Sequence, residues 1–236
     1  MSYQSSKARQ SFEFEIDSMI SVIEDTFKNT TVTHGTKNHV LSSCVMLCFA
    51  KIEVYIEDLF ESWIHKLNNS SPHLTSSMLP NNLKAFYFNQ DFLLNAYKKL
   101  LIDKNEKKFL ETMAAHINDT FFDITDPSKI TPTLDAKKIY WSKKYPSPQN
   151  IDSLFFRIGI KNIFNELNKE SRSDLEKSFI SFHEVRTDIA HNGIPPGLND
   201  NDIIDKLKGI KRFIEYMDTI LFVFLTRHSR IDMWET

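Results

Sequence analysis

The strongest constraint on the fold is a long helical pattern at residues 39–67. Apolar side chains recur there every three or four residues, which places them on one side of a helix. The same periodicity predicts helices over about 6–29, 82–99, 104–116, 150–168, 173–192 and 200–228, so the chain is expected to form an all-α bundle. The stripe of 39–67 consists of Leu41, Val45, Cys48, Ile52, Tyr55, Leu59 and Trp63.

Composition agrees with a helical, well-packed protein. The 236 residues include only 5 Gly, and 19 Phe supply a large aromatic core. His34-Gly35 indicates a loop over 30–38, and four prolines with several Thr and Asp predict that 118–148 is irregular, with room for a short strand or hairpin. No flexible linker divides the chain, so a single domain over 1–236 is predicted.

The net charge, the apolar segments and the cysteine spacing exclude several classes of protein. A formal net charge of −2 argues against a general polyanion binder, although a local basic site remains compatible with it. The first residues contain no apolar run typical of a signal peptide, and the apolar stretch 220–225 is too short to cross a bilayer. Cys44 and Cys48, one helical turn apart, lack a second ligand pair, so buried small side chains are favoured over a metal site. The expectation is a soluble, cytoplasmic protein that contacts no membrane.

The most informative local pattern is Arg186 followed by His191 and Asn192-Gly193. Arg186 falls on the apolar side of the predicted helix 173–192, where a guanidinium needs an anionic partner or an anionic ligand. Histidine is the side chain best suited to move protons near neutral pH. A cation and a proton carrier are the groups that a reaction at a phosphodiester requires.

The two side chains cannot meet on one regular helix. Residues five positions apart point about 140° from each other. Either the chain unwinds near Ala190, which Asn192-Gly193 would permit, or the site takes groups from a second copy of the protein.

The sequence around the motif resembles the HEPN superfamily of helical ribonucleases, particularly its RiboL-PSP-HEPN-like branch. The matching element runs from Arg186 to His191, includes Ile189-Ala190-His191, and is followed by Gly193. Two further matching segments are Ala50-Lys51-Ile52-Glu53-Val54-Tyr55-Ile56 and Asn150-Ile151-Asp152-Ser153-Leu154-Phe155. The likeness covers roughly residues 39–67 and 145–225.

The resemblance implies a four-helix core, formed by the helices at 39–67, 150–168, 173–192 and 200–228, with 70–148 as an elaboration. It also implies a homodimer in which two motif helices face each other. Arg186 would stabilise the scissile phosphate, and His191 would act as general acid or base in metal-independent RNA cleavage, with no cofactor. Such proteins commonly act as toxins or anti-phage effectors, so an antitoxin or defence partner is implied. Thr187 departs from the Asn, Asp or His that usually follows the Arg.

Other residues allow more than one interpretation. Glu53 could pair with Arg186 to hold the bundle together, support the site, or be simply exposed. For Asp188 and His183 a surface position is favoured over a contact to the site. A basic cluster with aromatic rings could contact single-stranded RNA or form a solvated loop. This basic cluster consists of Lys137, Lys138, Tyr140, Trp141, Lys143 and Lys144.

The alternative function is a non-catalytic HEPN module that binds RNA, nucleotide or a protein partner. A third possibility is a structural helical dimer.

Overall fold

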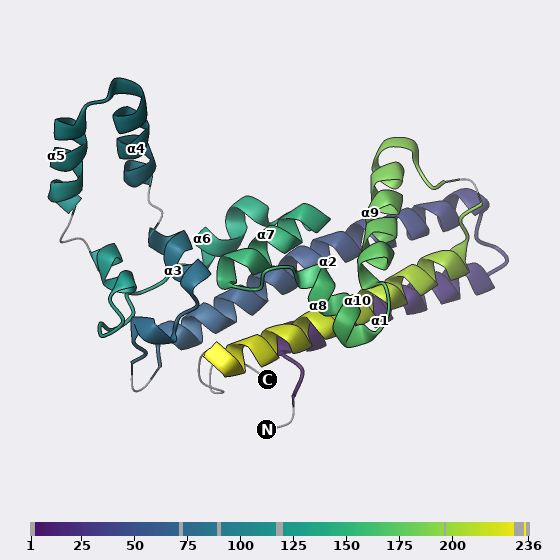
Figure 1. The fold of residues 1–236 in the computed structure, drawn as a ribbon. Coiled ribbons are helices and arrows are strands. Elements are labelled where there is room, and N and C mark those ends of the chain that lie inside the picture. Colours follow the sequence, from purple (N-terminus) through teal and green to yellow (C-terminus); the bar gives the residue numbers. More distant parts are fainter. Residues whose placement is uncertain are drawn as a thin grey trace.

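The structure, a computed structural model, describes residues 3–70, 73–88, 91–116, 120–195, 197–228 and 234. Three long helices run side by side through its body (Figure 1). They are α1 (Lys7–Lys28), α2 (His34–Asn68) and α10 (Asp200–His228). All seven residues of the predicted stripe in 39–67 are buried. The prediction of an all-α bundle is confirmed.

Helix α2 begins earlier than the sequence predicted. The side chain of Thr33 accepts a hydrogen bond from the backbone N–H of Thr36, and this cap starts the helix at His34. The His34-Gly35 pair therefore lies in the first turn of α2. The loop predicted over 30–38 is wrong for its second half, because the threonine cap outweighs the helix-weakening effect of one glycine.

The single helix predicted over 150–168 is two helices, α7 (Pro148–Ile158) and α8 (Ile163–Ser171). Gly159 ends α7 with a φ of 112°, a left-handed conformation that glycine adopts without strain. A Cβ at this position would also lie 3.1 Å from side-chain atoms of Phe224 and Pro80. Close packing against α10 thus reinforces the break.

Helix α9 (Leu175–Asn192) stands across α2 and α10 (Figure 1). Aromatic stacking fixes it to both helices. Phe182 stacks on Phe49 of α2 with ring centres 5.1 Å apart, and Phe179 stacks on Phe213 of α10 at 4.6 Å. The predicted helices over 173–192 and 200–228 are confirmed by α9 and α10.

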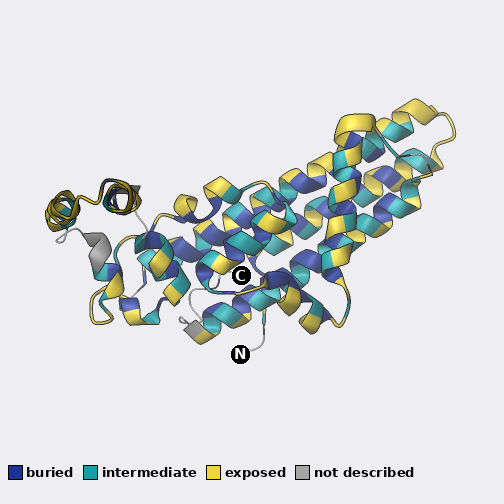
Figure 2. Cartoon of the chain, turned by 45° about the horizontal axis from the view of Figure 1, so that its top comes forward, coloured by how far each residue is buried: buried dark blue, intermediate teal, exposed yellow. Residues whose placement is uncertain are grey.

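Residues 73–116 extend the bundle at one end. They form α3 (Asn81–Phe88), α4 (Asp91–Asp103) and α5 (Glu106–His116), apart from the two positions 89–90 outside the described residues. Helices α4 and α5 pack mainly on each other and project from the body (Figure 1). Figure 2 shows that exposed residues dominate this hairpin. The helices predicted over 82–99 and 104–116 are present, the first divided between α3 and α4.

The described part of the segment 118–148 is more regular than predicted. It contains the short helices η2 (Thr120–Thr125), α6 (Ala136–Tyr140) and η3 (Trp141–Lys143), and an isolated β-bridge joins Thr75 to Ile130. The prediction of an irregular structure was wrong for the second half of 118–148. Helix α6 forms there because it packs against α2, with its residues Ala136, Ile139 and Tyr140 buried. Residues 118 and 119 lie outside the described residues.

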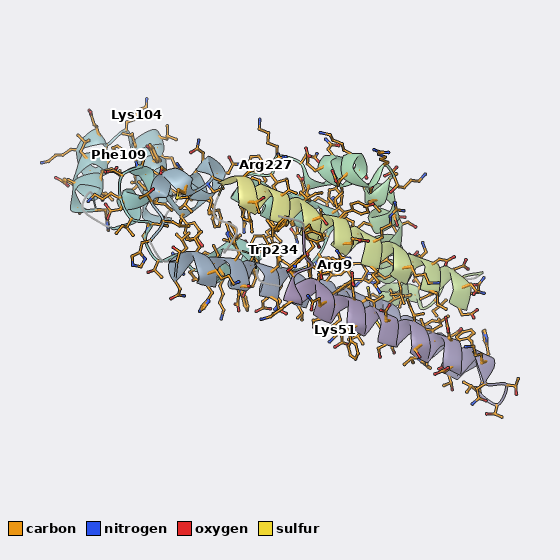
Figure 3. All side chains as sticks on the ribbon, turned by 90° about the horizontal axis from the view of Figure 1, so that it is seen from below. Arg9, Lys51, Lys104, Phe109, Arg227 and Trp234 are labelled. Atoms are coloured by element: carbon orange, nitrogen blue, oxygen red, sulfur yellow. The ribbon has the colours of Figure 1, made fainter. Side chains whose placement is uncertain are left out.

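A buried carboxylate links the chain's beginning to α10. Asp218 is fully buried and accepts hydrogen bonds from the Ser6 backbone and hydroxyl, at 3.0 and 2.5 Å, and from Tyr55 at 3.1 Å. Arg9 and Trp234 lie beside this network and are labelled over the middle of the bundle in Figure 3. An aspartate on the apolar side of α10 indicates that a buried hydrogen-bond network is present. Apolar periodicity alone does not reveal such a network.

Helix α2 is long and apolar enough to cross a membrane by length and composition alone. Its most apolar 18-residue window has a mean hydropathy of 1.5, and 44% of that window is buried inside the structure. Core helices of bundles meet the same criterion. Along α2, the residues between Leu41 and Leu67 bury an apolar side against α1, α6, α9 and α10.

Candidate functional site

Helix α9 carries the motif and continues without interruption through it. The Asp174 side chain caps its start by accepting a hydrogen bond from the Lys177 backbone N–H. At the other end, Gly193 has a φ of 81° and donates its backbone N–H to the carbonyl of Ile189. Ala190 therefore lies inside the helix.

This continuity separates the two motif side chains within one chain. Because α9 does not unwind near Ala190, the first alternative for bringing the pair together is wrong. Arg186 is partly buried, whereas His191 is exposed in the last turn. On a regular helix they point about 140° apart. Within one chain, the two side chains therefore lie on different sides of α9.

Arg186 packs on an aromatic ring. Its guanidinium carbon lies 5.2 Å from the centre of the Tyr145 ring, a cation–π distance. Its Nε is buried and has no hydrogen-bond partner among the described residues. The remaining guanidinium N–H groups form no hydrogen bond in the described part of the chain, so they can serve an anionic ligand.

Glu53 does not form an ion pair with Arg186, which was one of the interpretations of its sequence position. No pair within 4.0 Å joins Glu53 to Arg186 among the described residues, and Glu53 is half-buried on α2. Burial raises the pKa of the Glu53 carboxyl, while the charges of Lys144 and Arg186 act in the opposite direction. The interpretation in which this pair holds the bundle together is therefore wrong, whereas a supporting role at the site stays a prediction. Glu53 remains close enough to influence the site electrostatically.

The start of α7 holds Tyr145 in place. The carbonyl oxygen of Tyr145 accepts two hydrogen bonds, from the Ser147 backbone N–H at 2.8 Å and from the Asn150 side-chain amide at 2.9 Å. Ser147 is also the cap of α7, accepting from the Asn150 backbone at 3.2 Å. The ring that supports Arg186 is therefore anchored by a helix cap.

His183 lies one turn before Arg186 and contacts the same ring. Its Nε2 is 3.2 Å from the Tyr145 hydroxyl, and its ring centre is 5.8 Å from that of Phe49. Burial lowers the pKa of His183, and the charge of Arg186 lowers it further. The sequence interpretation favoured a surface histidine here. The structure instead places it in the group around Arg186.

The remaining motif residues contribute little within one chain. Thr187 donates its hydroxyl to the carbonyl of His183 at 2.9 Å, so that hydroxyl is occupied by its own helix. Asp188 and His191 are exposed.

The basic cluster is divided between structural and exposed residues. Lys144 forms an ion pair with Glu57 at 2.6 Å. Tyr140 is fully buried and donates to Glu57 and Glu61, so its ring is not available to stack on a base. Trp141 is 66% exposed, and Lys137 and Lys138 are exposed as well. Lys143 is half-buried.

Cys44 and Cys48 are both buried, and burial raises the pKa of each thiol. This agrees with the interpretation of the two cysteines as small core side chains. Among the residues that the structure describes, no group of three or more His, Cys, Asp or Glu side chains could hold a metal ion.

Sequence reasoning missed Tyr145 and undervalued His183. The spacing of three residues from Arg186 was a usable signal for His183, because such residues are neighbours on a helix. Tyr145 gave no comparable signal, since its contact joins segments 38 residues apart.

Comparison with known protein families identifies a match along most of the chain. The family model for RiboL-PSP-HEPN matches residues 13–222, which include α9 and the Tyr145 segment. No curated protein and no solved structure matches the chain.

Proposed function

The chain belongs to the RiboL-PSP-HEPN family, and from this membership we propose that it is a metal-independent endoribonuclease. Members of the HEPN family are often ribonucleases, so the family indicates a ribonuclease-like or nucleotide-related function. The observation that carries the proposal is the state of Arg186. Its guanidinium is held by an aromatic ring, lacks a carboxylate partner among the described residues, and is partly exposed.

In the proposed reaction, the ribose 2′-hydroxyl attacks the adjacent phosphorus. The new bond joins O2′ to phosphorus as the bond from phosphorus to O5′ breaks, leaving a 2′,3′-cyclic phosphate and a 5′-hydroxyl. One histidine removes the proton from O2′ and a protonated group delivers one to O5′. Arg186 stabilises the charge that develops on the phosphoryl oxygens. His191 is the proposed proton carrier.

The active form is proposed to be a homodimer, because Arg186 and His191 point about 140° apart on the continuous helix α9. An uncovered apolar side chain on α9 fits this arrangement. Ile180 is 36% exposed and lies one turn before His183. A second copy with its α9 near the two-fold axis would cover it.

Single-stranded RNA is the proposed substrate. Tyr145 connects Arg186 to the segment that carries the exposed Trp141, Lys137 and Lys138. Exposed rings stack on unpaired bases, and lysines follow the phosphate backbone. Asp188 could contact a bound strand from the exposed side of α9. The proposed setting is the cytoplasm, as a toxin or anti-phage effector with an antitoxin or defence-system protein as partner.

One observation favours a second candidate, a non-catalytic RNA-binding module. The Thr187 hydroxyl is bonded to the helix backbone, so it offers the site no free donor where the family usually has Asn, Asp or His. Such a module would still bind RNA at Arg186.

The test is to incubate the purified protein with mixed RNA in EDTA and to analyse the fragment ends. The proposal expects cleavage that the chelator does not affect, with cyclic phosphate ends. Cleavage that appears only after a divalent metal is added would refute the mechanism. RNA binding without cleavage would support the non-catalytic module.

A further inference from the structure

Two potentially cationic side chains contact a single aromatic ring. The Arg186 guanidinium lies over the Tyr145 ring at 5.2 Å, and the His183 imidazole meets the same ring edge-on at 5.9 Å. Both residues come from α9, three positions apart, so they are neighbours on its surface. Both are half-buried rather than sealed inside. His191, by contrast, lies on another part of α9.

We propose that His183 and Arg186 of one chain bind the same phosphodiester, and that His183 takes up a proton from solvent as the phosphodiester binds. The identity of the ligand as an RNA backbone rests on the proposed function. The coupling between ligand and proton rests on the geometry around Tyr145.

The surroundings of His183 disfavour its protonated form before the ligand arrives. On α9, Arg186 opposes protonation and Glu184 favours it; burial is the largest influence and also opposes it. From α2, the apolar ring of Phe49 covers one side of the imidazole. Glu53 of α2 lies near Arg186, because the charges of Lys144 and Arg186 both act on the Glu53 carboxyl. The pKa of His183 in the free protein therefore lies below the ordinary value for histidine.

A bound phosphodiester reverses the balance. Its negative charge beside Arg186 compensates the guanidinium and favours a second cation, so the pKa of His183 rises. By linkage, ligand affinity must increase as pH falls through the interval between the His183 pKa values of the free and bound protein. An increase of one pKa unit corresponds to about a tenfold gain in affinity.

The Tyr145 hydroxyl can form a hydrogen bond with His183 in either protonation state of the imidazole. The 3.2 Å contact between its hydroxyl and His183 Nε2 can be formed by a hydroxyl that donates to a neutral imidazole. It can equally be formed by an imidazolium that donates to the hydroxyl oxygen. Proton uptake at His183 therefore does not require this contact to break.

The experiment uses the full chain and a 2′-O-methyl RNA decamer, which lacks the attacking hydroxyl and cannot be cleaved by the proposed route. NMR titration of the His183 ring, assigned from its loss in His183→Gln, gives the pKa with and without the decamer. We expect the pKa to rise by about one unit on binding, and decamer affinity to fall by about tenfold from low to high pH.

Matched variants separate this coupling from folding. His183→Gln keeps a hydrogen-bonding side chain beside Tyr145 but cannot be protonated, so its decamer affinity should lose this pH dependence. His65→Gln, on an exposed part of α2, should retain it. Arg186→Ala should raise the pKa of His183 in the free protein, because a nearby cation is removed, and should abolish the further rise with decamer.

The outcomes distinguish this inference from the proposed function. An unchanged or lowered His183 pKa in the bound protein, or decamer binding that does not need Arg186, overturns the inference even if RNA is cleaved. Failure to bind the decamer at all also overturns it. Proton uptake on binding, in a protein that never cleaves RNA, supports the inference and refutes the nuclease.

Discussion

The hydroxyl oxygen of Tyr3 lies 2.6 Å from Oδ2 of Asp218, although 215 residues separate them in the sequence. The carboxylate accepts two further hydrogen bonds from Ser6 and one from Tyr55, so it accepts four in all. The network therefore joins the segment before α1, the middle of α2, and α10. It holds α1, α2 and α10 together, and α9 packs against the last two of these helices.

Asp218→Asn should destabilise the protein. Burial raises the pKa of Asp218, but the four donors need acceptors on both oxygens, and an amide nitrogen would present a further donor instead. Leaving buried donors unpaired should lower the free energy of unfolding by about 1–3 kcal/mol. Asp205→Asn, at an exposed position of the same helix, is the control and should change it by less than about 0.5 kcal/mol. Equal chemical denaturation curves for the two variants would contradict this role.

The fold could be predicted well where apolar periodicity was long. The apolar stripes of α2, α9 and α10 each specified a helix, and most residues of these stripes are buried. Local breaks were harder. The turn at Gly159 depends on the approach of Phe224 and Pro80, and the helix α6 depends on burial against α2. Neither contact can be inferred from residues near it in sequence.

The candidate site was only partly predictable for the same reason. The motif residue Arg186 could be placed on the apolar side of its helix from spacing alone. The residue that contacts Arg186 could not be predicted in this way. Glu53 was a candidate because its charge is opposite to that of Arg186, whereas the α7 cap brings Tyr145 into contact with Arg186. Electrostatic complementarity in a sequence indicates which pairs are favourable, not which pairs the packing allows.

Arg186→Ala should separate activity from stability. Because Arg186 forms no ion pair among the described residues and its Nε is buried unpaired, its removal should cost about 1 kcal/mol or less, through the contact with Tyr145. Breaking a buried ion pair would cost about 3–5 kcal/mol. RNA cleavage should fall by at least about 10²-fold. Arg212→Ala, which removes a similar contact to Tyr216 at 5.6 Å, should retain full cleavage. A variant that unfolds early would favour a structural role for Arg186 instead.

The stability of the protein should depend on pH through His183. Its pKa is lowered in the folded protein, so the folded state prefers the neutral imidazole. The resulting contribution to stability is present above the ordinary histidine pKa of 6.5 and is lost as pH falls from there through the lowered value in the folded protein. The melting temperature should therefore fall less steeply between pH 8 and pH 5 in His183→Gln than in wild type. Identical slopes would show that His183 is not buried in solution.

The lysines of the basic cluster should behave as two classes. The double variant Lys137→Ala/Lys138→Ala should bind RNA more weakly, with the slope of log affinity against log salt reduced by about 0.7 for each phosphate that is no longer neutralised. Lys144→Ala should instead lower stability, because Lys144 is paired to Glu57 at 2.6 Å. Lys208→Ala, exposed on α10, removes one lysine charge outside the basic cluster and is the control for binding, to be compared per charge removed. Filter binding over a salt series measures the slopes, and equal effects of all four positions would contradict the division.

Mixing two inactive variants should restore RNA cleavage. If each site takes Arg186 from one protomer and His191 from the other, then Arg186→Ala and His191→Ala homodimers are both inactive, with losses of about 10²–10⁴-fold. After subunit exchange, half of the molecules are heterodimers at random assortment, and each contains one site with both groups intact. Cleavage should then recover to about a quarter of the wild-type rate, a value that follows from counting intact sites and needs no change in their chemistry. The measurement combines RNA cleavage with sedimentation, which should show a dimer at micromolar concentration for wild type and both variants. Cleavage that stays at the level of the single variants, in samples where exchange is verified by tagged subunits, would mean that both groups act within one chain or that His191 takes no part.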